Sequence, residues 1–147
     1  MTTIAWDGMT LAGDRCSWSS GVRRTVKKVH KVTAPDGRRY LVGFTGDGDF
    51  CMAVLAWMKG EGERPAYADF GVDAANQFAV VIDEEMKVWA LSANLKYSRF
   101  YEQRMAYGAG QDMAWGALEA GADAKTAIQI VARRSDYAGL GVDCVRF

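Results

Sequence analysis

The sequence has few of the residues that build metal centres or disulfide frameworks. It contains three cysteines, a single histidine and no CxxC pair. The cysteines, Cys16, Cys51 and Cys144, form an odd and widely spaced set. We therefore expect reduced thiols, no metal site and a cytoplasmic location.

The sequence also lacks an excess of charge and a long hydrophobic run. Its 18 basic side chains balance its 18 acidic ones, which argues against a nucleic-acid partner. The longest apolar run, Phe50 to Met58, is about half of the roughly 20 residues that a membrane-spanning helix needs. The first residues have neither the basic start nor the apolar core of a signal peptide. We therefore expect no membrane partner.

What is present is a hydrophobic chain of moderate length. Of its 147 residues, 50% are hydrophobic and only two are prolines, which excludes disorder as a description of the whole chain. At this length one compact domain, residues 1–147, is the expectation.

The first residues predict a β-hairpin. Two short β-rich runs flank Asp7-Gly8, a pair typical of a two-residue turn that needs positive φ at both central positions. Such a turn would pair Ile4 with Leu11. It would also place Asp14 beside the N-terminus and therefore next to Thr2, with about 5–6 Å between direct partners.

The rest of the chain alternates between strand-like and helix-like segments. Antiparallel hairpins with a separate helix pair favour an α+β layered sandwich over a parallel sheet. The helix expected over 49–59 is apolar on nearly every face, which indicates that the sheet and a second subunit both cover it. Strands are expected over 22–33, 39–45, 77–82, 87–92, 105–107 and 142–146, and helices over 49–59, 111–119 and 124–134.

Most short motifs in the sequence have a structural explanation. The segment Gly46-Asp47-Gly48-Asp49 has neither the GK[ST] of a P-loop nor the distal Glu of an EF-hand, so it is interpreted as a corner that caps a helix. His30 has no nearby Cys, Asp or Glu in sequence, and no GxSxG elbow marks a serine nucleophile. Nothing in the sequence calls for a cofactor.

One constellation supports a chemical function. Removal of Met1 would leave Thr2 as the first residue, which would then carry a hydroxyl and an α-amine. An α-amine has an ordinary pKa of about 7.7–8.0, so it can act as a base near neutral pH. Such a site also needs a cation and a carboxylate that holds it. Asp14 supplies the carboxylate, and Lys27 and Lys28 are the candidate cations.

Several segments together resemble the proteasome β-subunit family, and most closely the bacterial HslV (ClpQ) peptidase and its shorter phage-type relatives. The matching segments follow one another along most of the chain. They are Met1-Thr2-Thr3-Ile4, Leu11-Ala12-Gly13-Asp14, Val26-Lys27-Lys28-Val29, Val42-Gly43-Phe44-Thr45-Gly46, Tyr107-Gly108-Ala109-Gly110 and Asp136.

The resemblance implies an N-terminal nucleophile (Ntn) hydrolase with a four-layer αββα sandwich. It implies that Thr2 is the nucleophile and that its freed amine is the general base. Asp14 and Lys28 match the family's charged partners, and Gly46 matches the glycine whose N–H stabilises the tetrahedral oxyanion.

The supporting positions depart from the family's pattern. Ala109 stands where a serine lies near the active-site amine, and Asp136 begins a distal Asp-x-x-Ser-Gly motif that is only half met. The resemblance further implies a homo-oligomeric ring that cleaves peptides or unfolded polypeptides, alone or with an ATP-driven unfoldase. Two alternatives are a ring-forming scaffold or binding protein without the chemistry, and an amidase for a small substrate on the same fold.

Overall fold

The computed structural model describes residues 2–66, 69, 77–92 and 94–147. Within them lie two antiparallel sheets of four and five strands, and a short hairpin that forms a sheet of its own. The element order places strands β1 (Thr3–Trp6) to β6 (Arg39–Thr45) before helix α1 (Gly48–Lys59). The strands between them are β2 (Leu11–Asp14), β3 (Cys16–Ser19), β4 (Val22–Thr25) and β5 (Val29–Thr33).

The second part of the chain begins with three strands and ends with a helix pair and one strand. The strands β7 (Phe78–Ile82), β8 (Val88–Ser92) and β9 (Tyr97–Phe100) form a meander. The remaining elements are β10 (Met105–Gly108), α2 (Gln111–Glu119), α3 (Ala124–Arg134) and β11 (Val142–Val145).

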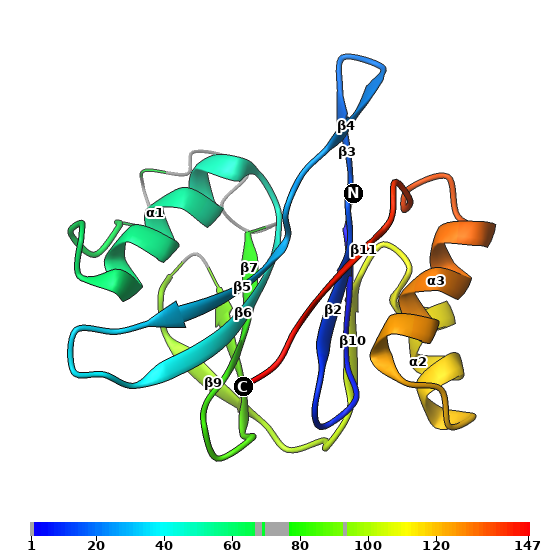
Figure 1. The fold of residues 1–147 in the computed structure, drawn as a ribbon. Helices are drawn as coiled ribbons and strands as arrows, with labels where there is room; N and C mark the ends of the chain where they lie inside the picture. Colours follow the sequence, from blue (N-terminus) through cyan, green and yellow to red (C-terminus); the bar gives the residue numbers. More distant parts are fainter. Residues whose placement is uncertain (1, 67–68, 70–76, 93) are drawn as a thin grey trace.

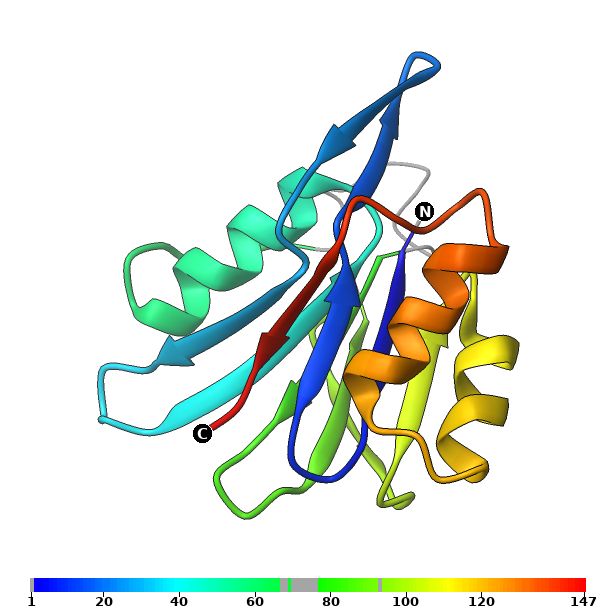
Figure 2. The ribbon, with the colours of Figure 1, turned by 45° about the vertical axis from the view of Figure 1, so that its right-hand side comes forward.

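The first sheet has the strand order β10-β1-β2-β11, and helices α2 and α3 pack against it. Figure 2 shows these helices covering one face of that sheet. Its contact with the helices is made largely by small side chains. They are Ala5, Ala12, Ala106, Ala114, Ala124, Ala127 and Ala138, together with Leu118, Ile128 and Val131.

The second sheet has the order β5-β6-β7-β8-β9, and α1 packs on its outer side (Figure 1). Larger side chains fill this interface, among them Phe44, Phe50, Leu55 and Met58. The inner faces of the two sheets meet in a third cluster, which includes Ile4, Trp6, Leu41 and Met105. Strands β1 and β2 therefore lie at the centre of the molecule, with both of their faces buried.

The prediction of a four-layer αββα sandwich of the Ntn-hydrolase type is wrong. The structure is mostly antiparallel sheet, and the described residues form only three short helices. Two of these cover the first sheet, whereas α1 is the single described helix against the second. The expectation of four layers rests on the resemblance alone. The helix periodicity in the sequence supports only the three helices that the structure shows among its described residues.

The N-terminal hairpin has a different register from the predicted one. Ile4 pairs with Gly13 and Trp6 pairs with Leu11, a shift of two residues. The cause is the Asp7 side chain, whose Oδ1 accepts hydrogen bonds from the backbone N–H groups of Met9 and Thr10 and so stabilises a longer turn. A two-residue shift leaves every side chain on its predicted face, but it moves Asp14 opposite Thr3.

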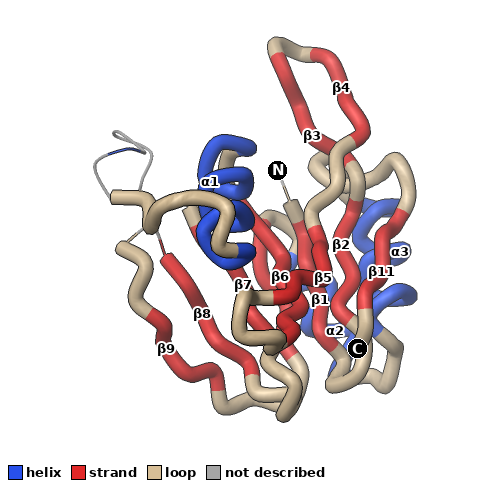
Figure 3. Tube along the Cα trace, turned by 60° about the vertical axis from the view of Figure 1, so that its left-hand side comes forward, coloured by secondary structure: helices blue, strands red, loops and turns tan. Residues whose placement is uncertain are grey.

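The strand expected over 22–33 is split into β4 and β5. Strand β4 pairs with β3 to form a hairpin that projects from the body of the molecule (Figure 3), and β5 joins the second sheet. Ser20 and Gly21 both have positive φ at the tip, as a tight hairpin turn requires. The helices expected over 49–59, 111–119 and 124–134 are confirmed to within one residue. No helix among the described residues is long and apolar enough to cross a membrane.

Candidate active site

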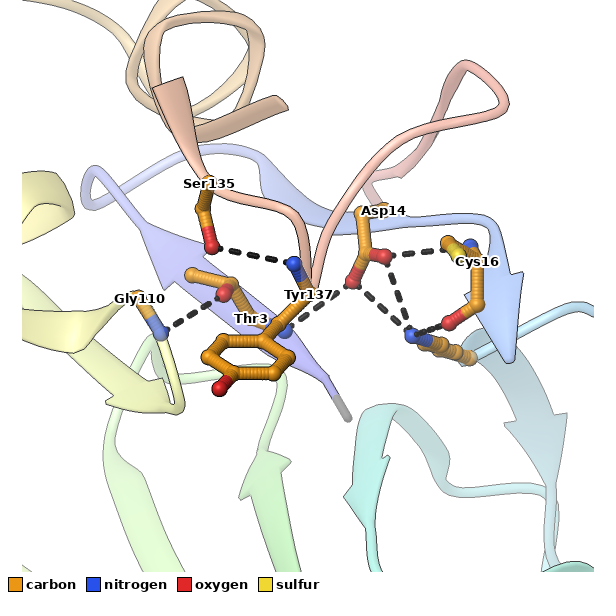
Figure 4. A network of polar contacts seen from close by, with 7 residues as sticks. Thr3, Asp14, Cys16, Gly110, Ser135 and Tyr137 are labelled. Atoms are coloured by element: carbon orange, nitrogen blue, oxygen red, sulfur yellow. Dashed lines mark hydrogen bonds and ion pairs between the residues drawn. The ribbon is translucent and has the colours of Figure 1, made fainter. Parts of the chain in front are cut away.

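Three hydrogen bonds fix the first residues of β1 to their neighbours. The carbonyl oxygen of Thr2 accepts from the backbone N–H of Ala109 at 2.8 Å. The backbone N–H of Thr3 donates to Asp14 Oδ1 at 3.0 Å, and Thr3 Oγ1 accepts from the N–H of Gly110 at 3.0 Å (Figure 4). The backbone at Thr2 is therefore held from both sides, by β2 and by the loop that leads into α2.

Asp14 and Lys28 form a buried ion pair next to this strand. Lys28 Nζ lies 3.0 Å from both carboxylate oxygens of Asp14, and it also donates to the carbonyl oxygen of Cys16. The N–H of Cys16 donates to Asp14 Oδ2 at 3.0 Å. Asp14 is 0% exposed and Lys28 is 6% exposed. The carboxylate thus connects its own strand β2 with Thr3 of β1, Cys16 of β3 and the segment before β5.

Burial lowers the pKa of the Lys28 ammonium below its ordinary value, and the attraction of the Asp14 carboxylate opposes that shift. The loss of hydration is the larger of the two causes. Lys28 consequently releases a proton more readily than a solvated lysine. It also places a cation beside the N-terminal strand whenever it is charged.

Gly46 directly follows β6, the strand that pairs with β5 beside Lys28. The carbonyl oxygen of Lys28 accepts from the N–H of Phe44 at 2.9 Å, which joins the segment before β5 to the end of β6. Two residues later, Gly46 has a φ of +105° and is exposed. The hydrogen bonds therefore run from Thr3 through Asp14 and Lys28 to within two residues of Gly46.

The corner after Gly46 is held by a residue to which the sequence assigned no role. Gln77 is 3% exposed; its Oε1 accepts from the N–H of Asp47 at 2.9 Å, and its Nε2 donates to Asp47 Oδ2 at 3.1 Å. Asp47 in turn caps α1, because its Oδ1 accepts from the N–H of Phe50. Thr3, Cys16 and Gln77 are thus polar contacts of this region that the motif analysis missed.

The two supporting positions, Ala109 and Asp136, have different surroundings. Ala109 is next to Thr2 through its backbone, but its methyl side chain offers no hydroxyl. Asp136 is exposed and has no hydrogen bond or ion pair within the described residues. It lines a surface cavity of about 680 Å³ together with Trp18, Arg23 and Arg134. Ala109 is therefore bonded to the N-terminal strand through its backbone, whereas no hydrogen bond among the described residues joins Asp136 to it.

The described part of the chain holds no group of three or more His, Cys, Asp and Glu side chains that could bind a metal ion. Outside the site, Cys51 Sγ and His30 Nε2 lie 3.9 Å apart. Burial raises the pKa of the Cys51 thiol to about 11 and lowers that of His30. Both groups are therefore neutral at neutral pH.

No protein-family profile matches the chain, and no curated protein matches it. Solved structures do match over nearly the whole chain. The BPH protein of Thiobacillus denitrificans is 19% identical, with a TM-score of 0.70 over 99% of this chain and 96% of the other. A second BPH structure, in complex with epoxomicin, has a TM-score of 0.69 at 17% identity, over 99% and 97% of the two chains.

Anbu, described as an ancestral beta-subunit, from Yersinia bercovieri is 9% identical, with a TM-score of 0.68 over 100% of this chain and 81% of the other. These likenesses show a shared fold. They also correct the resemblance drawn from the motifs: the fold is that of the BPH and Anbu structures, and the assignment to HslV or a proteasome β-subunit is wrong. Motifs of four or five residues are too short to separate such groups at this level of identity.

Proposed function

We propose that the chain is a threonine peptidase whose nucleophile is Thr2, freed at its amine by removal of Met1. In this mechanism Thr2 Oγ1 attacks a peptide carbonyl and the α-amine accepts the hydroxyl proton. The amine passes this proton to the departing peptide nitrogen as the C–N bond breaks and the acyl-enzyme forms. Water then attacks the ester carbonyl, and the amine takes a proton from the water and gives it to the departing Thr2 oxygen, which releases the acid product.

The observation that carries this proposal is the buried Asp14–Lys28 pair fixed to the N-terminal strand. Burying an ion pair is costly unless it is well hydrogen-bonded, and this one is saturated by the backbone N–H groups of Thr3 and Cys16. Its position has a chemical use: a cation beside Thr2 favours the neutral amine and lowers the pKa of the hydroxyl. Asp14 holds Lys28 in that place.

We assign the stabilisation of the oxyanion to the N–H of Gly46. A preorganised donor at the developing negative charge is the largest single contribution in many acyl transfers. Gly46 is exposed and follows β6 directly, so its N–H is available to a substrate, and its positive φ favours glycine. Ala109 and Asp136 are assigned supporting roles only.

The proposed substrates are peptides or unfolded polypeptides, and the proposed assembly is a homo-oligomeric ring in the cytoplasm, alone or with an ATP-driven unfoldase. Three features support this part. Epoxomicin, a peptide epoxyketone, is bound in one of the BPH structures, one Anbu is named as a subunit, and Met52 of α1 is 68% exposed. We further propose that residues 1–147 act as one domain.

A second candidate is a ring-forming scaffold without peptidase activity. The lack of a hydroxyl at Ala109 and the half-met motif at Asp136 favour it. Substitution of Thr2 separates the two candidates, because Thr2→Ala abolishes hydrolysis in the first and changes nothing in the second.

The direct test is intact mass after incubation with a peptide epoxyketone, which reacts with an α-amine and with the hydroxyl of the same residue. We expect a species that lacks Met1 and carries one inhibitor per chain, and no adduct on Thr2→Ala. A chain that keeps Met1 and stays unmodified contradicts the peptidase. Sedimentation at micromolar concentration tests the ring, and a monomer would contradict it.

A further inference from the structure

The corner between β6 and α1 has a fixed conformation. Strand β6 ends at Thr45, Gly46 turns the chain with a φ of +105°, and Asp47 caps α1 in an extended conformation. The peptide that follows Gly46 carries the N–H of Asp47. Whatever holds this peptide sets the dihedral angles of Gly46, and so the direction of the Gly46 N–H.

The side chain of Gln77 holds that peptide. Gln77 directly precedes β7, and β7 pairs with β6 so that Phe78 lies opposite Thr45. Its amide lies over the glycine: a Cβ built on Gly46 would be 2.0 Å from Gln77 Oε1 and 3.2 Å from its Cα. Its two hydrogen bonds use both ends of the amide on one residue, the N–H and the Oδ2 of Asp47.

The two carboxylate oxygens of Asp47 have different partners, which separates its contact with Gln77 from simple helix capping. Oδ1 of Asp47 accepts from Phe50 and begins α1, whereas Oδ2 accepts from Gln77. The cap would hold α1 without Gln77. The bond from the Asp47 N–H to Gln77 supplies a partner for the donor just before the first turn of α1, and it also holds the peptide that follows Gly46. What it fixes is the turn at Gly46.

We propose that Gln77 is a positioning residue that orients the Gly46 N–H toward the oxyanion formed during peptide-bond cleavage. This inference rests on the proposed function. Gln77 does not touch the substrate; it acts by holding the peptide between Gly46 and Asp47 in one orientation. Donors that are already aligned cost no reorganisation when the negative charge develops, which is why such alignment raises kcat.

The first test compares Gln77→Met with Gln129→Met. Both changes replace glutamine by methionine of similar length, and Gln129 is exposed on α3, away from the corner. Removing an oxyanion donor costs about 10²–10³ in kcat, and misdirecting one should cost less. We expect kcat of Gln77→Met to fall by about tenfold to a hundredfold with KM within about twofold, and no change in Gln129→Met.

A second test exchanges the partners of the contact. Gln77→Glu alone places two carboxylates together, and we expect a loss of kcat. Adding Asp47→Asn restores an amide and a carboxylate with their positions swapped. The new carboxylate can accept from the N–H of residue 47 and from its side-chain amide, and the helix cap is kept. We expect the double variant to recover most of the lost kcat.

The outcomes separate the inference from the proposed function. If wild-type protein reacts with the epoxyketone and Gln77→Met keeps its kcat, or if the exchanged pair gives no recovery, the positioning role is overturned. If wild-type protein does not react, the peptidase proposal fails, and the catalytic role of Gln77 fails with it. In that case, hydrogen exchange of the Asp47 backbone amide tests whether Gln77 holds the peptide between Gly46 and Asp47. We expect this exchange to be faster in Gln77→Met than in wild type. An unchanged rate would overturn this structural role of Gln77 as well.

Discussion

The two sheets bury their outer faces in different ways. The first packs against α2 and α3 mainly through alanines, whereas the second packs against α1 through phenylalanine, leucine and methionine. Small side chains let a helix approach the strand backbone closely, and this is where Gly110 at the start of α2 reaches the hydroxyl of Thr3. Large side chains bury more apolar area but keep the backbones apart. The part of the molecule around the first sheet is thus arranged for exact placement of backbone groups, and the part around the second sheet for burial.

The ionic contacts follow the same division. The Asp14–Lys28 pair is buried beside the first sheet, whereas Arg39 and Glu84 form an exposed pair at the end of the second. A buried pair is sensitive to the loss of one partner, because the other charge stays behind without compensation. An exposed pair contributes little. A substitution in the buried pair should therefore lower the free energy of unfolding much more than a substitution in the exposed pair.

The largest effect is expected for Lys28→Met. The change leaves the Asp14 carboxylate buried beside an apolar side chain, and breaking such a pair costs about 3–5 kcal/mol of unfolding free energy. We also expect peptidase activity to be lost. Arg39→Met is the matched control, with an expected cost below about 1 kcal/mol. Urea unfolding measures both; equal costs for the two variants would contradict the comparison.

A smaller effect is expected for Gly110→Ala. Its Cβ would lie 2.3 Å from Val131 Cγ1 and 2.6 Å from Thr3 Oγ1, so the helix pair must move away from β1. Overpacking of this kind costs about 1–3 kcal/mol. Gly116 of α2 has open space at the same position, and Gly116→Ala should stabilise the protein by about 0.5–1 kcal/mol. Thermal unfolding gives both values, and a destabilised Gly116→Ala would show that α2 tolerates no added volume at all.

Thr3→Val should cost about 1–3 kcal/mol, because the buried N–H of Gly110 loses its acceptor while the side chain keeps its shape. Thr3→Ser keeps the hydroxyl and should recover most of the loss. Equilibrium unfolding of the two variants checks this. Equal destabilisation by Val and Ser would mean that the methyl group of Thr3, and not its hydroxyl, matters.

The smallest effect concerns Cys51 in α1, against the second sheet. Burial raises the pKa of its thiol from 9.0 to about 11, so the unfolded chain ionises first as pH rises. The stability that Cys51 contributes is present below about pH 9 and is lost as pH rises toward 11. Unfolding measured from pH 8 to 11 should show this loss in wild type and a weaker one in Cys51→Ala. Parallel curves would exclude Cys51 as its source.

Local patterns in the sequence were enough to predict the helices and most strands. Asp123 and the apolar spacing after it mark α3, and Asp47 marks the start of α1. The split between β4 and β5 was missed because no glycine or proline interrupts the run from Val22 to Thr33. The hairpin register was missed because it depends on the side chain of Asp7, and not on the Asp-Gly pair alone.

The candidate site was predictable only in part. The proximity of Asp14 to the N-terminal strand followed from the hairpin, and the choice of Lys28 over Lys27 came from the resemblance. Nothing local marks Gln77, because its contact with Asp47 arises from the pairing of β6 with β7 across thirty positions of sequence. The number of helical layers was likewise a tertiary property that no local pattern specifies.

The strand order of the first sheet has a consequence for biosynthesis. Strands β1 and β2 are made first, yet their outer neighbours are β10 and β11, from the last third of the chain. Contacts between such distant segments form late, since the ends of a long loop must be brought together first. On the ribosome, β1 has no outer partner until Gly108 has emerged, and β2 has none until Val145 has emerged. A nucleophile at Thr2 would therefore acquire its contact with Ala109 only once synthesis has passed β10, which would protect nascent chains nearby from premature cleavage.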